Sequence, residues 1–183
     1  MGSSDAVLIS REPVEVVLAG ARFLLPYAPA GQWIVQLEWL DTLAARMATP
    51  ADREVMTDLI LDQPNGRDIL RNVSRQLLSA VCRRPWWEAY RLLDLSVSPQ
   101  GLGHLALAGM RPWECAVGEW CAATYALYTR DADDKSRLQF DFRLSIPPRD
   151  HRDNGWGDER GDDPEEIERA MAKMTGGGRG ITG

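Results

Sequence analysis

Histidine and cysteine are scarce in this chain of 183 residues, which contains two of the former and three of the latter. Nucleophilic catalysis by serine or cysteine needs a base held beside the nucleophile. His151 falls in a polar stretch that we expect to be disordered, and His104 follows two glycines, where a structural or solvent-facing role is typical. The chain also lacks the G-x-S-x-G motif of many hydrolases. These absences argue against an enzyme.

A metal or phosphate site is disfavoured by spacing and context. The chain has no C-x-x-C pair, and ten and five residues separate His104, Cys115 and Cys121, which matches no zinc pattern. A fourth ligand is also missing. The glycine-rich "TGGGRGITG" has no strand before it and no helix after it, so it does not fit a phosphate-binding loop. We therefore expect no metal, no cofactor, and three reduced, mostly buried thiols.

Excess positive charge and long apolar runs are absent as well. Acidic residues outnumber Lys and Arg by 27 to 21, so the formal net charge is −6 and general attraction to nucleic acid is not expected. No stretch approaches the roughly eighteen apolar residues of a membrane span. The opening "MGSSDAVLIS" lacks the features of a secretory signal. The length is typical of one globular domain.

Residues 1–28 are predicted to form a β-hairpin packed on a helical domain. Two apolar runs, Val14 to Leu18 and Arg22 to Leu25, flank the pair Ala19-Gly20. Gly20 can adopt the positive φ that a tight turn requires, so the two runs are expected to pair as antiparallel strands.

Residues 29–146 are predicted to be the helical domain, which makes the fold class mainly α. Apolar steps of three and four, with start and stop signals, predict helices over 31–48, 50–61, 65–81, 85–97, 100–109 and 112–130. Residues 138–144 are expected to add either a last helical turn or an edge strand. Residues 147–183 are polar and acidic, so we expect a disordered tail, within which 163–174 forms at most a transient helix.

Three of these helices also have predicted faces. The buried stripe of the second helix is expected to contain Val55, Met56, Leu59 and Ile60. The solvated side of the third is expected to carry Arg67, Arg71 and Arg75, which are four residues apart. The helix predicted to begin at Pro112 aligns Trp113, Val117, Trp120, Cys121, Thr124 and Tyr128 on one apolar stripe.

The seven tryptophans are the most informative residues for function. Adjacent helical residues point about 100° apart, so Trp86 and Trp87 are not expected to face the same core. One ring is expected to be buried, and the other to lie at the core edge or on display; the alternative is that both pack inside the domain. Aromatic side chains are favoured at interfaces. The candidate partner-binding residues are Trp86, Trp87, Tyr90, Trp113 and Trp120.

Three segments share a wider pattern: "FLLPYAPAGQWIVQL", "RRPWWEAYRLL" and "LALAGMRPWECAVGEWCAATYALY". Together they resemble the tail assembly chaperones of long-tailed phages that infect actinobacteria. In that family a Pro-Ala step precedes a Trp-containing helix, an "RPWW" motif opens a helix that ends in two aliphatic residues, and a Gly-to-Pro turn leads into a helix with a central Trp. The matching residues are Pro29, Trp33, Pro85, Trp86, Trp87, Leu92, Leu93, Gly109, Pro112 and Trp120.

The resemblance, which covers roughly residues 21–130, implies a chaperone. Such proteins bind the tape-measure protein, a long helical and hydrophobic chain, keep it soluble and promote assembly of the tail tube around it. They act in the host cytoplasm during phage assembly and are not expected in the mature virion. A ribosomal frameshift often produces a longer form, and the extension recruits the tail-tube protein. The "GGGRGITG" segment is compatible with such a site.

Two other classes of function stay open from the sequence. One is a structural protein of the virion, such as a connector or a minor tail protein, which purified particles would contain. The other is a regulator or small binding module with a fully packed aromatic core, which would have no affinity for the tape-measure protein. Self-association through an edge of the hairpin also stays open.

Overall fold

The computed structural model describes residues 12–148. The chain divides into two compact units, residues 1–131 and 132–183. The described residues contain eight α-helices and one two-stranded antiparallel hairpin, so the predicted mainly α fold with an N-terminal hairpin is confirmed. The predicted tail, from residue 149 onward, and the transient helix at 163–174 lie outside the described residues. The domain boundary expected after residue 146 stays a prediction.

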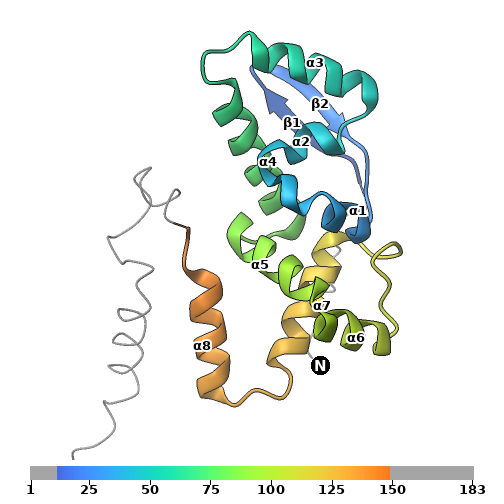
Figure 1. The fold of residues 1–183 in the computed structure, drawn as a ribbon, viewed down its shortest axis with the longest axis vertical. Helices are drawn as coiled ribbons and strands as arrows, with labels where there is room; N and C mark the ends of the chain where they lie inside the picture. Colours follow the sequence, from blue (N-terminus) through green and yellow to red (C-terminus); the bar gives the residue numbers. More distant parts are fainter. Residues whose placement is uncertain (1–11, 149–183) are drawn as a thin grey trace, which may run out of the picture. The chain divides into compact units, whose positions relative to one another are not determined.

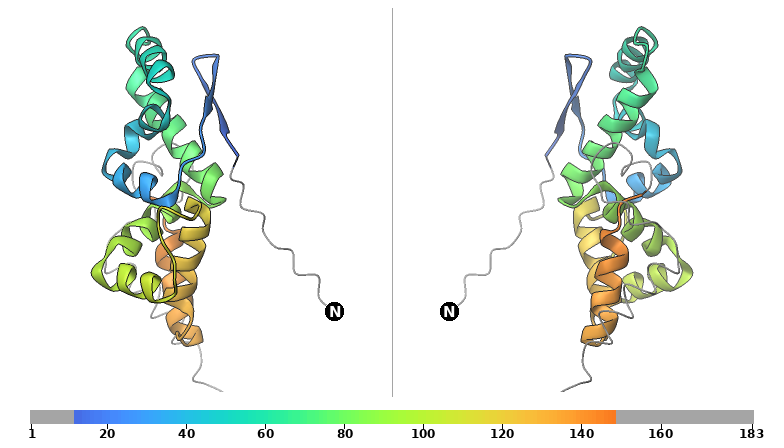
Figure 2. Two further views of the ribbon diagram at one scale, coloured as in Figure 1. Left: turned by 90° about the vertical axis from the view of Figure 1, so that its right-hand side faces the viewer. Right: turned by 90° about the vertical axis from the view of Figure 1, so that its left-hand side faces the viewer.

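The hairpin pairs β1 (Val14–Leu18) with β2 (Ala21–Leu25), in the register Val16↔Phe23. Ala19 and Gly20 form the turn with φ of 49° and 83°, and two consecutive positive values are characteristic of a type I′ turn. One face of the hairpin is buried and contacts α4 (Gly66–Cys82). Figures 1 and 2 show the hairpin standing beside this helix.

The single helix predicted over 31–48 is wrong, because the chain breaks there into three pieces. These are α1 (Ala30–Val35), a 3₁₀ turn (Leu37–Thr42) and α2 (Leu43–Met47). The backbone leaves helical geometry at Trp39, whose carbonyl accepts a hydrogen bond from Thr42 Oγ1 at 3.2 Å. Apolar residues spaced three apart fit a 3₁₀ turn as well as an α-helix, so this spacing in the sequence could not distinguish the two structures.

The next two helices, α3 (Pro50–Leu61) and α4, differ from prediction in their faces. Thr49 caps α3 as expected, since its hydroxyl accepts the Asp52 N–H. The expected buried stripe is confirmed at Met56, which is fully buried, and is wrong at Val55, which is 50% exposed. Leu59 and Ile60 are half-buried. The expected solvated side of α4 is wrong at Arg75, whose side chain is only 14% exposed. The contacts of α4 with the hairpin, α2, α3, α5 and α7 bury part of its surface, whereas Arg67 is exposed as expected.

The remaining helices of the first unit are α5 (Trp86–Val97), α6 (Pro99–Leu107) and α7 (Val117–Thr129). The predicted stop at Ser98-Pro99 is confirmed, and the Ser98 hydroxyl accepts the Gly101 N–H to begin α6. Their shared core with α4 is closely packed: Leu78, Ala89, Leu92, Leu93 and Trp120 are at most 1% exposed. No helix within residues 12–148 is long and apolar enough to cross a membrane.

The helix predicted to begin at Pro112 begins at Val117 instead. Residues 112–116 are used by α1: the Pro112 carbonyl accepts the Gly31 N–H at 2.7 Å, and the Cys115 carbonyl accepts the Ala30 N–H at 2.9 Å. The first N–H groups of a helix need such partners. The Pro112 and Cys115 carbonyls therefore accept the first N–H groups of α1. The segment that contains them is not part of α7, which begins at Val117.

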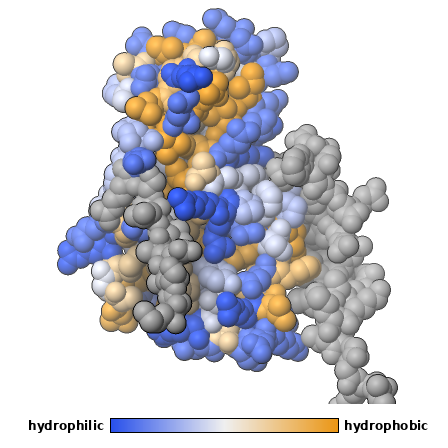
Figure 3. Space-filling model, turned by 180° about the vertical axis from the view of Figure 1, so that it is seen from behind, coloured by the Kyte–Doolittle hydropathy of each residue, from blue (hydrophilic) through white to orange (hydrophobic). Residues whose placement is uncertain are grey.

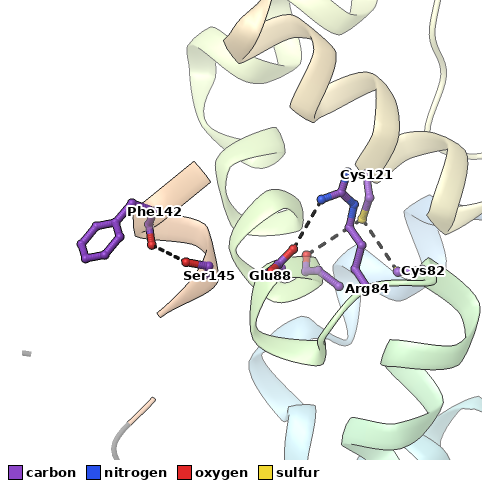
Figure 4. A network of polar contacts seen from close by, with 7 residues as sticks. Cys82, Arg84, Glu88, Cys121, Phe142 and Ser145 are labelled. Carbon is purple, nitrogen blue, oxygen red and sulfur yellow. Dashed lines mark hydrogen bonds and ion pairs between the residues drawn. The ribbon is translucent and has the colours of Figure 1, made fainter. Parts of the chain in front are cut away.

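In the second unit, the described part is α8 (Asp134–Ser145), so the alternative left open for residues 138–144 is settled as helix. The Asp133 carboxylate accepts the Ser136 N–H at 2.7 Å and caps its start. Near its end, the Ser145 hydroxyl donates to the Phe142 carbonyl at 2.9 Å (Figure 4).

Candidate partner-binding surface

Trp86 and Trp87 are both half-buried, so the expected division into one buried ring and one displayed ring is not observed. Their rings meet edge to face, with centroids 6.0 Å apart and planes at 85°. The guanidinium of Arg75 stacks over Trp86 at 4.2 Å, in a cation–π contact. Both indole nitrogens are buried. Trp86 therefore joins α5 to α4 through Arg75, and Tyr90, one turn later on α5, is also half-buried.

Trp120 is 1% exposed, and this corrects its selection as a partner-contacting residue. Its Nε1 donates to Ser96 Oγ at 2.8 Å, between α7 and α5. Thr124, one turn further along α7, is also fully buried. No partner can reach this ring without opening the core, so Trp120 is a packing residue.

Trp113 has the opposite environment, because it is 61% exposed and lies before α7 rather than on it. The hydrogen bonds from the start of α1 to the Pro112 and Cys115 carbonyls hold its backbone in place. Its ring lies directly over Gly31: a Cβ placed on that glycine would come within 2.6 Å of the indole. One side of the ring thus covers α1, and much of the remaining surface is open to solvent.

Helix α6 presents a second apolar surface, which sequence reasoning missed. Leu102 and Leu107 are exposed, the latter at 87%, while Gly101 and Leu105 are the buried residues of this helix. No Asp, Glu, Lys or Arg occurs between Pro99 and Leu107. A solvent-facing helix ordinarily carries charged residues on its outer face. The lack of charged residues could have predicted an exposed apolar surface here, whereas the two glycines only weaken the prediction of a helix.

Trp39 is a further exposed ring that was not among the candidates. It is about half-exposed on the 3₁₀ turn, with the guanidinium of Arg46 stacked on it at 4.4 Å and its Nε1 bonded to Glu38 at 2.6 Å. These two contacts occupy a face and the polar edge of the ring. Trp39 therefore offers less free surface than Trp113 and serves below as a matched control.

The cysteines and His104 do not assemble. Among residues 12–148 no group of three potential ligands is close enough to hold a metal ion. Cys115 donates to the Arg111 carbonyl, whereas the sulfurs of Cys82 and Cys121 lie 3.8 Å apart (Figure 4). The hydrogen bond with Cys121, together with burial, raises the pKa of the Cys82 thiol well above its ordinary value of 9.0. A protonated, buried thiol is a poor nucleophile.

The chain matches no known protein-family model, no curated protein and no solved structure.

Proposed function

We propose that this protein is a tail assembly chaperone of the long-tailed phage type, which binds the tape-measure protein and promotes assembly of the tail tube around it. Two independent features support the proposal. The first is the resemblance carried by the segments around Trp33, Trp86 and Trp120. The second, which carries most weight physically, is the uncharged, exposed surface of α6 together with the displayed ring of Trp113.

These exposed apolar side chains suit an amphipathic helical partner. Fully burying one exposed leucine contributes on the order of 1.5–3 kcal/mol, so covering Leu102, Leu107 and the Trp113 ring would favour binding. Helix-in-groove recognition relies on a few such anchors. The net charge of −6 keeps the chaperone soluble while these residues remain exposed. We propose that they, rather than the half-buried Trp86 and Trp87, contact the tape-measure chain.

The test is co-expression with the tape-measure protein of the same genome, followed by affinity purification and measurement of the soluble fraction. We expect the tape-measure protein to become soluble and to co-purify. Leu107→Ser and Trp113→Ala should each reduce the recovered complex several-fold. Leu61→Ser and Trp39→Ala are matched controls, because they remove a comparably exposed leucine (77%, against 87% for Leu107) and another exposed tryptophan from other elements. Circular dichroism of each variant verifies that the fold is retained.

Two results would contradict the proposal. The first is an insoluble, unbound tape-measure protein; the second is equal loss of binding in the controls and in the α6 and Trp113 variants. Localisation gives a separate check, since we propose action in the host cytoplasm and absence from mature virions. Stoichiometric amounts of the protein in purified particles would favour a connector or minor tail protein instead. A longer frameshifted product that recruits the tail-tube protein belongs to the same proposal.

A further inference from the structure

The hairpin exposes one face that no other described residue covers. Its side chains are those of Glu15 and Val17 on β1 and of Arg22 and Leu24 on β2, and all are exposed. Val17 and Leu24 are 54% and 61% exposed, although residues of the opposite face are buried. Seen from behind (Figure 3), hydrophobic surface emerges in the upper region, where the hairpin lies.

The strand register gives this face a specific layout. Glu15 stands opposite Leu24, and Val17 stands opposite Arg22. The two charged residues therefore occupy one diagonal of the face, and the two apolar residues occupy the other. The two charged residues form an ion pair across the face, with Arg22 Nη1 3.5 Å from Glu15 Oε1.

This layout is self-complementary under a single two-fold axis. If the axis runs along the Val17–Leu24 diagonal, each of these residues meets its own copy. The same rotation places Glu15 of each molecule against Arg22 of the other. An axis along the strands, or across them, would instead set charged side chains against apolar ones. We propose that this face docks a second copy of the chain, with Val17 and Leu24 on the symmetry axis.

The geometry agrees with known sheet packing. Cross-strand neighbours lie about 5 Å apart and alternate residues of a strand about 6.8 Å apart, so the proposed axis makes the strands of two copies cross at about 70°. This angle is close to the orthogonal class of sheet-on-sheet packing. Four side chains per molecule bury less than the roughly 800 Å² per partner of a standard interface. We therefore expect a weak dimer, so its mass must be measured at protein concentrations up to about 1 mM.

Charge reversal provides the decisive test, by sedimentation equilibrium of the full chain. The wild type should shift from monomer toward twice that mass as its concentration rises. Glu15→Arg gives a face with two positive charges and Arg22→Glu a face with two negative charges, so each variant should dimerise at least about tenfold more weakly. An equimolar mixture of the two variants should form a heterodimer at least as strong as the wild-type dimer. Each variant loses only an exposed ion pair, so its fold persists.

Cysteine cross-linking tests the position of the axis. Val17→Cys and Leu24→Cys place a thiol on the axis, and each should form a covalent dimer with oxidised glutathione. Glu15→Cys should not cross-link with itself but should do so with Arg22→Cys. A wild type that stays monomeric at 1 mM overturns the proposal. Dimerisation that the two single reversals leave unchanged, or cross-linking of Glu15→Cys with itself, also overturns it and indicates pairing of strand edges. None of these outcomes depends on binding to the tape-measure protein.

Discussion

The indole Nε1 of Trp120 donates to the hydroxyl of Ser96 at 2.8 Å, at a point where both side chains are fully buried. That hydroxyl donates in turn to the Leu93 carbonyl at 2.6 Å. A large core side chain thereby has its single polar atom satisfied, and α7 is fixed against α5. A buried indole N–H without such a partner would cost free energy that offsets part of the gain from burying the ring.

Ser96→Ala should therefore lower the free energy of unfolding by about 1–3 kcal/mol, because the buried N–H of Trp120 loses its acceptor. Urea denaturation measures this loss. In the Trp120→Phe background the same substitution should cost much less, since no indole N–H remains to be satisfied. Equal losses in the two backgrounds would show that the hydrogen bond to Trp120 contributes nothing and that the cost comes from the other contacts of Ser96, including its bond to the Leu93 carbonyl.

Features that depend on neighbouring residues could be predicted from the sequence. The hairpin followed from two apolar runs around Ala19-Gly20, and the helix boundaries at Thr49 and Ser98 followed from capping chemistry. In each case the hydrogen bonds that fix the structure join residues only a few positions apart. Local pattern and observed conformation therefore agree.

Features that depend on distant partners could not be predicted in this way. The carbonyls of Pro112 and Cys115 serve the start of α1, about eighty residues away, so no local signal showed that α7 begins late. The same relationship moves Trp113 out of the predicted apolar stripe and onto the surface. Similarly, the sequence predicts a solvated Arg75, whereas in the structure its guanidinium stacks on the Trp86 ring of the next helix. The candidate surface therefore became visible only with the tertiary structure.

The contact between Gly31 and Trp113 can be tested by substitution. Gly31→Ala places a methyl group where the indole now lies, at 2.6–2.9 Å from three ring atoms, so the ring must move. We expect a loss of stability of about 1–2 kcal/mol, similar to other overpacked sites, measured by urea denaturation. Binding of the tape-measure protein should fall as well, if the ring is a contact.

The matched background for this substitution is Trp113→Ala. With the ring removed, Gly31→Ala should be neutral or stabilising, since alanine is favoured over glycine in a helix such as α1. A loss that persists without the indole would assign the cost of Gly31→Ala to the backbone of α1 rather than to the ring.

The start of α8 should respond to acid through Asp133. Hydrogen bonds from the side chain and the N–H of Ser136 lower the pKa of this carboxyl below its ordinary value of 3.8. Because the pKa is lower in the folded state, the cap stabilises α8 fully above the ordinary value and is lost as the pH falls through the lowered one. Carbon chemical shifts of the first turn, recorded from about pH 6 to about pH 2.5, should show this fraying.

Asp133→Asn is the control for this acid effect, since asparagine caps helices as well as aspartate but does not titrate. Its first turn should remain helical at low pH, whereas Asp133→Ala should fray at every pH. If the asparagine variant loses helix at the same pH as the wild type, other carboxyl groups of α8 cause the transition.

Ala19, in the hairpin turn, has a strained backbone conformation that a substitution can relieve. Ala19 has a φ of 49°, which is costly for a residue with a Cβ, and asparagine or glycine is preferred at this position of a type I′ turn. Ala19→Asn should therefore raise the free energy of unfolding by about 0.5–1 kcal/mol, measured by urea denaturation. Gly20→Ala is the opposite control. Its φ is 83° and a Cβ there meets no atom within 4 Å, so its expected loss of about 1 kcal/mol comes from backbone strain and not from a clash. A destabilised Ala19→Asn variant, beside an unaffected Gly20→Ala variant, would mean that the turn does not adopt the type I′ conformation in solution.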